Sequence, residues 1–577
     1  MSDQPNGVAA ETTERYAIGI SFGNSNSSIA HISPEGKPQV IANEEGDRHI
    51  PSVLSYVEGE EYHGAQAKAQ LVRNPKNTIA YFRDYLGKDF KSIDPTPAHA
   101  SAHPQLHDSS VAFTVRDTAA EEPNTITVSE VTTRHLRRLK QSASDFLGKD
   151  VNAAVVTVPT DFSEAQRTAL KAAAKEAGVE VIQFVHEPVA ALLAYDAIPE
   201  TQVKDKLVVV ADFGGTRSDI AIIASRGGMY TVLATVHDPE LGGAQLDQIL
   251  IDHFAKEFIK KHKTDPRENE RSLAKMKLEA EVTKKALSLG TTAALSIESL
   301  ASGIDFSSTV NRTRFELLSG KVFSSFTQLI EQAIKKAELH VLDIDEVILC
   351  GGTSHIPKIA RLVQSLFSPS TTVLSPSTSP TAINPSDLAA RGAAIQASLI
   401  EEFEKEDIEQ STHPMVTVAP HLEKAIGVQL VSADQSAEST AIFKPLLSAE
   451  TALPARRTAQ YAVPKDGGDV IIRVCEGARD IKVIKPEPKR KPAGPKEDSD
   501  VDSDDESEEE EEDIREIVWN VSKPIAEFAI KGVKANGKVE VMISVNEHLV
   551  MQVTAREVGA KGGVRGVVDG PQNGVAA

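Results

Sequence analysis

The sequence predicts an α/β protein with two facing lobes, followed by an all-β region. Two glycine-rich loops support the first part: residues 19–27 (GISFGNSNS) and residues 212–219 (DFGGTRSD), each beside an apolar, β-rich run. Glycines let a backbone approach phosphate oxygens and present N–H donors to them, so a pair of such loops indicates two facing lobes. The all-β region is predicted from period-two patterns at residues 469–474 and 539–545.

The first lobe is expected over residues 16–201 and the second over residues 202–400. The first lobe mixes short β-branched strands with helical patterns such as residues 163–177. The second lobe opens on a buried-type strand at residues 207–210 and includes a charged amphipathic helix at residues 267–288, just after a proline.

Composition limits the class of protein. The chain has 577 residues with 40% hydrophobic content, enough for roughly three to four compact units. The net charge of −21 argues against a surface that binds nucleic acid throughout, and much of that charge lies in residues 497–513. Cys350 and Cys475 are too few for a disulfide framework and suit a reducing compartment. Because neither a signal peptide nor an apolar run of ~18 residues is found, a cytoplasmic protein is expected.

Further segments extend the pattern set by the two loops. They follow in a fixed order: residues 151–159 (VNAAVVTVP), 162–167 (FSEAQR), 186–191 (HEPVAA), 347–357 (VILCGGTSHIP), 383–385 (INP) and 391–397 (RGAAIQA). In this order and spacing they resemble the actin-like ATPase domain of the heat-shock protein 70 chaperone family. The resemblance runs from about residue 16 to residue 400.

The resemblance implies ATP as cofactor, with Mg²⁺ held through water by Asp212 and Asp219. Lys68 matches the lysine that in this family lies near the terminal phosphate and positions the attacking water. Glu187 matches the glutamate that organises the water shell of the metal. Taken alone, Lys68 reads as a surface lysine and Glu187 as an acid at a helix N-terminus.

The resemblance also implies a set of nucleotide-binding positions from both loops, one helix and one glycine turn. They are Gly23, Asn24, Ser25, Gly214, Gly215, Thr216, Glu281, Lys284, Lys285, Ser288, Gly351, Gly352, Thr353 and His355. Within this set the residues from Glu281 to Ser288 are expected at the adenosine, where Lys285 replaces an arginine. His355 stands where an arginine usually stacks on adenine. Without the resemblance, the charged residues of this helix read as a solvated face.

Several departures from the family pattern fall in the loops. Ser21 replaces an aspartate beside the metal, and Asn24 and Ser25 replace a threonine pair. In the second loop Thr216 replaces a glycine and Arg217 replaces a threonine. Because phosphoryl transfer depends on a positioned metal and water, these changes are expected to damage hydrolysis more than ATP binding. The sequence therefore predicts an ATP-binding protein with little or no hydrolysis.

The C-terminal part departs further. Residues 401–415 are expected to form a linker, and residues 411–416 (STHPMV) stand where the family has a leucine-rich segment. Residues 416–557 are expected to form a shortened β-domain, interrupted by a disordered acidic insertion at residues 485–513. A disordered, glycine-rich tail is expected at residues 558–577, with no helical lid.

These combined losses are similar to those of the atypical heat-shock-70-like subunits of the eukaryotic ribosome-associated complex. The resemblance implies a stable heterodimer with a zuotin-like J-domain protein and ribosome contact largely through that partner. It also implies a co-chaperone role for a second, active heat-shock chaperone in nascent-chain folding, without membrane or direct nucleic-acid contact. Open sheet edges give a physical reason to expect a partner strand.

Two alternatives remain at this level. An active ATP-hydrolysing chaperone that binds its own clients requires nucleotide-dependent release, and the altered linker argues against it. A sugar or glycerol kinase of the actin-like superfamily shares paired phosphate loops. The period-two strands after residue 416 argue against the kinase, because such an enzyme has no β-domain there.

Overall fold

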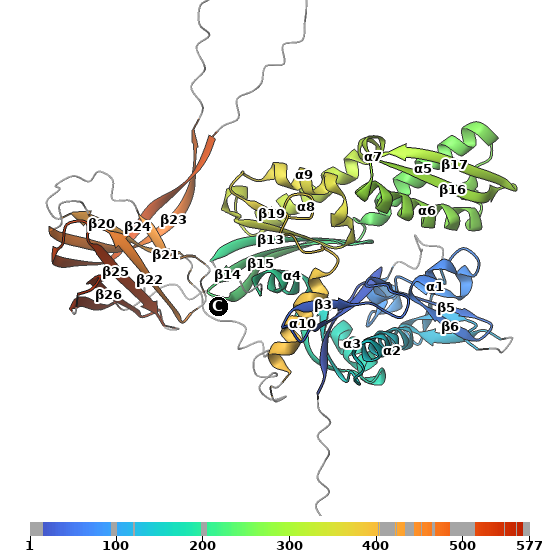
Figure 1. The fold of residues 1–577 in the computed structure, drawn as a ribbon, viewed down its shortest axis with the longest axis horizontal. Helices are drawn as coiled ribbons and strands as arrows, with labels where there is room; N and C mark the ends of the chain where they lie inside the picture. The colour runs from blue at the N-terminus through green and yellow to red at the C-terminus, as the bar shows by residue number, and fades with distance from the viewer. Residues whose placement is uncertain are drawn as a thin grey trace, which may run out of the picture. The chain divides into compact units, whose positions relative to one another are not determined.

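The computed structural model describes residues 15–93, 101–118, 122–197, 205–401, 403, 422, 424–432, 443–449, 451, 453–463, 468–484, 514–546, 549–560 and 562–568. Two compact units separate along the chain, unit 1 (Met1–Thr412) and unit 2 (His413–Ala577), and each is described by itself. In their described residues, unit 1 combines helices and strands whereas unit 2 contains strands alone (Figure 1).

Two mixed β-sheets form the centre of unit 1. The first consists of β1 Ala17–Phe22, β2 Asn26–Ile32, β3 Pro38–Ile41, β4 Ile50–Pro51, β11 Ala153–Val158 and β12 Glu180–His186. The second consists of β13 Lys206–Phe213, β14 Ser218–Arg226, β15 Met229–Asp238, β18 Glu346–Cys350 and β19 Thr372–Leu374. We call the part of unit 1 that contains the first sheet lobe I and the part that contains the second sheet lobe II.

The two sheets repeat one topology. Read in the same direction, their strand orders are β3-β2-β1-β11-β12, with β4 also paired to β2, and β15-β14-β13-β18-β19. In each sheet three strands that follow one another in sequence form an antiparallel meander. On the other side of the first of them, β1 or β13, the sheet continues with two strands that run parallel to it. As a result, the turns after β1 and β13 occupy equivalent places, and these turns hold the two glycine-rich loops. Both β11 and β13 are buried over nearly their whole length, which explains their apolar sequences.

Ten α-helices are found in the described part of unit 1. They are α1 Gly64–Ala69, α2 Val128–Leu147, α3 Glu164–Glu176, α4 Glu187–Asp196, α5 Gly243–His262, α6 Glu270–Leu289, α7 Arg312–Leu318, α8 Gly320–Lys336, α9 Pro357–Leu366 and α10 Leu388–Ile400. The predicted helix at residues 163–177 is confirmed as α3, where Ser163 and Gln166 form a capping box. The predicted start of α6 just after Pro266 is wrong. A short 3₁₀ turn, Pro266–Glu268, comes first, and the Asn269 side chain caps the helix by accepting from the N–H of Ser272.

Helices α4 and α10 cross between the lobes. Ala191 and Leu192 of α4 pack against Val208 and Ile348 of the second sheet. Residues 390–397 of α10 pack instead against the first sheet. Residues 388–400 were placed in the second lobe by sequence order, and the structure corrects this placement, because the chain returns to lobe I after completing the second sheet.

A glycine permits the close approach of these two helices. A Cβ on Gly392 of α10 would lie 1.8 Å from the carbonyl oxygen of Ala190 in α4. Any larger residue at position 392 would therefore force the helices apart. The crossing ties the two sheets together at the base of the cleft between them.

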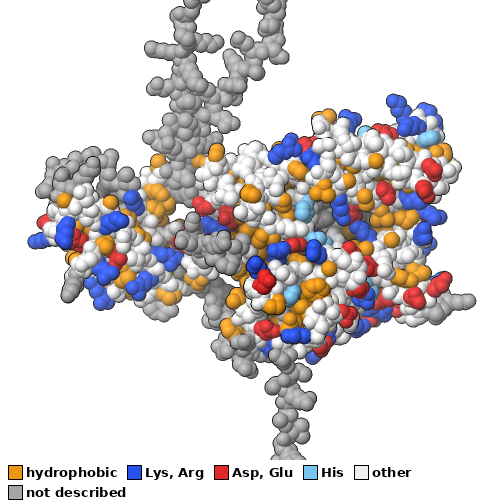
Figure 2. Space-filling model, viewed as in Figure 1, with side chains coloured by type: hydrophobic (Ala, Val, Ile, Leu, Met, Phe, Trp, Pro, Cys, Tyr) orange, Lys and Arg blue, Asp and Glu red, His pale blue; other side chains and the backbone are white. Residues whose placement is uncertain are grey.

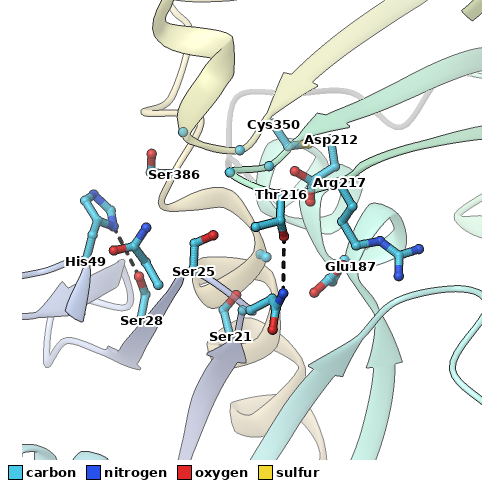
Figure 3. A pocket seen from close by; sticks show the side chains of 18 of the residues that line it. Ser21, Ser25, Ser28, His49, Glu187, Asp212, Thr216, Arg217, Cys350 and Ser386 are labelled. Carbon is cyan, nitrogen blue, oxygen red and sulfur yellow. Dashed lines mark hydrogen bonds between the residues drawn. The ribbon is translucent and has the colours of Figure 1, made fainter. Parts of the chain in front are cut away.

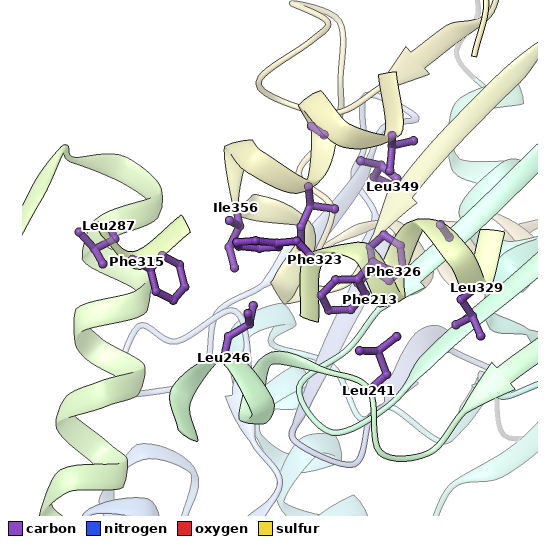
Figure 4. Close-up of a cluster of buried hydrophobic side chains, with 14 of the residues drawn as sticks. Phe213, Leu241, Leu246, Leu287, Phe315, Phe323, Phe326, Leu329, Leu349 and Ile356 are labelled. Atoms are coloured by element: carbon purple, nitrogen blue, oxygen red, sulfur yellow. The ribbon is translucent and has the colours of Figure 1, made fainter. Parts of the chain in front are cut away.

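The core of lobe II is rich in phenylalanine. Phe213, at the end of β13, meets Phe326 of α8 with ring centroids 4.7 Å apart in an edge-to-face arrangement (Figure 4). Phe323 and Phe315 continue this cluster toward α6. Because Phe213 also belongs to the second glycine-rich loop, the core anchors that loop directly.

Three smaller sheets complete unit 1. They are formed by β5 Val53–Val57, β6 Glu60–His63 and β7 Thr78–Ala80, by β8 Pro104–His107, β9 Ser110–Val115 and β10 Asn124–Thr127, and by β16 Thr292–Ala301 and β17 Ile304–Asn311. No helix in the described part of the chain combines the length and the apolar character that crossing a membrane requires.

Unit 2 contains two four-stranded antiparallel sheets. One has the order β21 Lys444–Leu447, β20 Ala425–Ser432, β23 Gly468–Ile484, β24 Ile514–Val533. The other has the order β22 Ala455–Ala462, β25 Lys538–Val545, β26 Met551–Glu557, β27 Gly563–Val568. Alternating side chains from both sheets, such as Val474 and Val541, share one hydrophobic core.

The structure corrects one part of the predicted tail. Residues 563–568 form strand β27, paired with β26, instead of belonging to a disordered tail. The glycines hid the alternation of this strand, in which Val564 and Val568 face the same side. Residues 569–577 lie outside the described residues, as do the insertion at residues 485–513 and residues 404–421 of the linker region.

Candidate functional site

The two glycine-rich loops face each other across one cavity. The cavity has a volume of about 140 Å³ and is lined by residues from β1, β2, β13, β14, α4 and the turn after β18 (Figure 3). The lining residues are Ser21, Gly23, Asn24, Ser25, Asn26, Ser28, His49, Arg83, Glu187, Asp212, Gly214, Gly215, Thr216, Arg217, Asp219, Cys350, Gly351, Gly352, Pro385, Ser386 and Ala389. The structure therefore brings together the two loops, Glu187, Asp212, Asp219, Gly351 and Gly352.

Two of the departures from the family pattern contact each other. The Asn24 amide nitrogen in the first loop donates to the Thr216 hydroxyl in the second loop at 3.2 Å, one of the dashed lines in Figure 3. The loops approach so closely here that a Cβ on Gly215 would lie 2.5 Å from the Ser25 hydroxyl oxygen. The Ser52 hydroxyl donates to the Gly23 carbonyl oxygen at 2.7 Å and holds the first loop from behind. The substituted loops thus form a direct clasp across the cleft.

Arg83 is a functional candidate that the sequence analysis missed. It lies in the short 3₁₀ helix Arg83–Tyr85, is buried, and lines the cavity. One guanidinium nitrogen donates to Glu187 at 3.2 Å and to the Phe22 carbonyl oxygen at 3.3 Å, and another forms an ion pair with Asp84 at 2.7 Å. A lone arginine in a short turn gives no periodic or motif signal, so only the structure identifies it.

Arg217 binds one of the two predicted metal ligands. Its guanidinium contacts both carboxylate oxygens of Asp219, at 2.7 Å and 2.5 Å, and reaches Asp161 at 2.9 Å. Asp219 stands directly opposite Asp212 in the β13–β14 ladder. This bidentate arrangement is the strong form of a guanidinium–carboxylate contact.

Burial and crowding disfavour charge on the carboxylates of the cavity. Burial raises the pKa of Asp212, and the neighbouring Asp219 raises it further. Burial likewise raises the pKa of Glu187, despite the opposing effect of Arg83. The pKa of Asp219 is also raised by burial, with Arg217 opposing that shift. In the ligand-free cleft these groups therefore keep protons at higher pH than exposed carboxyls do.

These contacts do not fit a Mg²⁺ ion held by the cavity. Hard cations need ionised oxygen ligands with free lone pairs. Here the Arg217 guanidinium binds Asp219 and the Arg83 guanidinium binds Glu187. In the first loop, Ser21 stands where the family has an aspartate beside the metal. Among the described residues, no group of three or more His, Cys, Asp or Glu is arranged to hold a metal. The expectation that Asp212 and Asp219 hold a hydrated Mg²⁺ is therefore not supported by their surroundings.

Lys68 contacts the opposite lobe beside the two loops. Its ammonium group contacts Glu281 of α6 at 2.6 Å, and Lys68 does not line the cavity between the loops. It lines two neighbouring cavities instead, together with Tyr81 and Asp247. One of these cavities is also lined by Ser25 of the first loop and Thr216 of the second, so the expected place of Lys68 near a terminal phosphate stays a prediction.

Residues on α6 that were expected at the adenosine make different contacts in this conformation. Lys284 is buried and donates to Asp247 at 2.7 Å and to the Gly243 carbonyl oxygen at 2.9 Å. Lys285 is largely exposed and contacts Glu281 at 2.8 Å, and the Ser288 hydroxyl donates to the Lys284 carbonyl oxygen at 3.1 Å. None of these residues lines the cavity between the loops.

The glycine turn after β18 does border the cavity. The Thr353 hydroxyl donates to the Gly214 carbonyl oxygen at 2.8 Å, so the turn and the second loop are tied together. His355 lies 3.1 Å from the Ser386 hydroxyl, beside the cavity wall. Across the cleft, His49 contacts the Ser28 hydroxyl at 3.1 Å and Asp387 at 3.3 Å. Two imidazoles therefore lie near the Ser386–Asp387 segment, and His49 also lines the cavity.

The arrangement is suited to binding a polyphosphate more than to cleaving one. Glycine loops from both lobes supply backbone N–H donors for phosphate oxygens. A metal-bound or carboxylate-oriented attacking water would need the same carboxylates that Arg83 and Arg217 already engage.

Comparison with known proteins agrees with this geometry. The family model described as Hsp70 protein matches residues 17–431. The chain is 44% identical over 552 residues to the ribosome-associated complex subunit SSZ1 of Saccharomyces cerevisiae, covering 95% of this chain and 99% of that protein. It is 43% identical to a heat shock protein 70 homologue of Schizosaccharomyces pombe, covering 97% of each chain. It is 32% identical to heat shock 70 kDa protein 14 of Homo sapiens, covering 80% of this chain and 87% of that protein. The paired loops, the repeated sheet topology and these matches together establish that the chain belongs to the Hsp70 protein family, which implies an actin-like nucleotide-binding domain.

Proposed function

We propose that this protein binds ATP with little or no hydrolysis and acts as a non-cycling subunit of a ribosome-associated complex. In this role it pairs stably with a zuotin-like J-domain protein, reaches the ribosome largely through that partner, and assists a second, active Hsp70 in nascent-chain folding in the cytoplasm. The similarity to SSZ1 over 95% of the chain supports the complex.

One observation carries the proposal of binding without turnover. Arg217 occupies both carboxylate oxygens of Asp219, and Arg83 occupies Glu187. A cavity with its carboxylates engaged in this way can present backbone N–H donors to phosphate, but it has no ligands to spare for orienting a metal and a water. The loop clasp between Asn24 and Thr216 favours one closed arrangement over a cycle of opening and closing.

Unit 2 is proposed to be a shortened β-domain that holds one permanent partner segment. Each of its sheets ends in strands whose outer edge has no hydrogen-bonded strand partner among the described residues, namely β21 and β24 in one sheet and β22 and β27 in the other. An extended segment of the J-domain partner would add main-chain hydrogen bonds to such an edge. Residues 401–415 would then connect the units without reporting nucleotide state.

Calorimetry with ATP and single-turnover hydrolysis test the nucleotide part on the full chain. Saturable ATP binding is expected, with almost no phosphate released over many minutes. Release at rates ordinary for an active chaperone would support the active-foldase alternative. Phosphate transfer to glycerol or a sugar would support the kinase alternative.

Co-purification tests the partner part. The full chain is expected to bring down a J-domain protein in equal amount from cell extract, and saturating ATP is expected not to release it. A chain ending at Thr412 should lose most of the partner while keeping ATP binding. If the shortened chain holds its partner as tightly as the full chain, the proposed role of unit 2 is wrong.

A further inference from the structure

Charge in unit 2 is divided between the described residues, which are basic, and an acidic segment. Among the described residues of His413–Ala577, Lys and Arg outnumber Asp and Glu, although the whole chain carries a net charge of −21. The acidic excess lies in residues 497–513, outside the described residues. The net charge argues against a surface that binds nucleic acid throughout, but this uneven distribution means that it does not argue against a basic surface on unit 2.

The outer face of the β22-β25-β26-β27 sheet collects much of the basic charge. Alternate residues such as Val541 and Val553 point into the core, so their neighbours point outward. The outward residues are Arg456, Thr458, Gln460, Lys538, Glu540, Met542, Ser544, Gln552, Thr554, Arg556, Arg565 and Val567. Figure 2 shows Lys and Arg side chains over this sheet with few carboxylates among them.

Most of the cations on this face are free to bind an external anion. Its one carboxylate, Glu540, accepts from Arg556 at 2.7 Å. The Arg456 guanidinium donates to the Met542 sulfur at 2.9 Å. Neither it nor Lys538 nor Arg565 has a carboxylate partner among the described residues. All three are exposed, and hydroxyl and amide side chains lie between them. The face therefore combines uncompensated positive charge with many hydrogen-bond donors.

We propose that this sheet face binds RNA through its phosphate backbone. The proposal rests on the proposed function, because a ribosome-bound subunit meets RNA phosphates at high density. Arginine forks match phosphate oxygens. Arg456 and Arg565 stand on the two outer strands, three strand spacings or roughly 14 Å apart across the sheet and two residues out of register along it. No aromatic side chain is among the outward residues, so bases have nothing to stack on and the binding has no sequence preference.

Salt dependence gives the binding a quantitative signature. A face that neutralises three to four phosphates of a single strand should lose affinity with a log–log slope of about −2 to −3. Between about 50 mM and about 200 mM salt this corresponds to a drop of about 20- to 50-fold.

Fluorescence anisotropy of the full chain with a labelled oligouridylate of about 20 nucleotides tests the proposal. The variant Arg456→Gln/Lys538→Gln/Arg565→Gln is expected to bind at least about tenfold more weakly and with a shallower salt slope. The matched control is Lys444→Gln/Lys523→Gln/Lys531→Gln. It changes net charge by the same amount at exposed positions of the other sheet, and it is expected to bind as the unchanged protein does.

Three outcomes would overturn the proposal: equal binding by the first variant, equal loss in the control, or tighter binding of a polyglutamate peptide than of RNA. The last outcome would point to an acidic protein partner. Co-purification of the J-domain partner with the first variant separates this inference from the proposed function, because the complex is expected to survive while RNA binding is lost.

Discussion

Lys68 of α1 and Glu281 of α6 are joined by an ion pair of 2.6 Å that spans the cleft between lobe I and lobe II. Both side chains are largely buried, at 22% exposure each. Burial alone would raise the pKa of Glu281, but the ammonium groups of Lys68 and Lys285 outweigh it and lower that pKa to about 2. The pair therefore acts as an electrostatic bridge that helps to hold the lobes together.

Removing this bridge should loosen the cleft. We expect Lys68→Ala to lower the stability of the ligand-free protein by about 1 kcal/mol, a shift of about 2 to 4 °C in Tm, and to leave phosphate release as low as before. Lys285→Ala is the matched control, because Lys285 contacts the same carboxylate from the same helix but is 68% exposed. Equal effects of the two changes on Tm and on hydrogen exchange in α1 would contradict the bridging role.

ATP binding should be nearly independent of Mg²⁺. Because Arg217 already neutralises Asp219, calorimetry in Mg²⁺ and in chelator is expected to give similar affinities. In Arg217→Thr the carboxylate is released, and ATP affinity should then become at least about tenfold stronger with Mg²⁺ than without it. Arg361→Thr, on an exposed side chain of α9, serves as control. A strict Mg²⁺ requirement in the unchanged protein would refute this prediction.

The ligand-free protein should lose stability as the pH rises toward neutral. Asp212 has a folded pKa raised above its ordinary value of 3.8 by burial and by Asp219, so its proton is bound more tightly in the folded state. Such a group stabilises the fold at low pH, and that contribution disappears as pH rises through the raised pKa.

Melting curves between about pH 5 and about pH 8 measure the effect, and a loss of about 1 to 3 kcal/mol is expected. Asp212→Asn should flatten the profile, since an amide cannot titrate. Asp108→Asn, at a side chain that is 94% exposed, should leave it unchanged. A profile that rises with pH in the unchanged protein would show that the sign is wrong.

The crossing of α4 and α10 should be intolerant of any side chain at position 392. Gly392→Ala places a Cβ against the Ala190 carbonyl oxygen, and a cost of about 3 kcal/mol or more is expected because backbone must move. Gly320→Ala is the control, because a Cβ at that helical position meets nothing within 4 Å. It should be neutral or stabilising by up to about 1 kcal/mol. Similar melting temperatures for the two variants would contradict the close packing.

Sequence patterns predicted local strands and helix caps well, but they did not predict which sheet a helix packs against. The buried strand at residues 207–210 and the capped helix after Ser163 follow from runs and caps that each lie within a few residues. The crossing of α4 and α10 depends on contacts between residues about two hundred positions apart, which no local pattern encodes. Strand β27 was missed because glycine contributes no side chain to an alternating pattern.

Predictions of the site divide in the same way between local motifs and contacts made through packing. The loops were identified because glycine spacing has a direct meaning for phosphate approach. Arg83 was not identified, because a single cation in a short element gives no sequence signal and only its contacts with Phe22 and Glu187 reveal it. The contact between Asn24 and Thr216 joins two substitutions that sequence analysis treats as separate losses.

Strands β23 and β24 remain paired up to Ile484 and Ile514, which stand opposite each other at the border of the acidic insertion. The insertion therefore leaves and re-enters the ribbon at neighbouring points, whatever its length. Loop-closure entropy grows only with the logarithm of loop length, and each doubling costs about 0.6 kcal/mol. Insertions, deletions or replacements between Ile484 and Ile514 should consequently leave the strand register of both sheets unchanged.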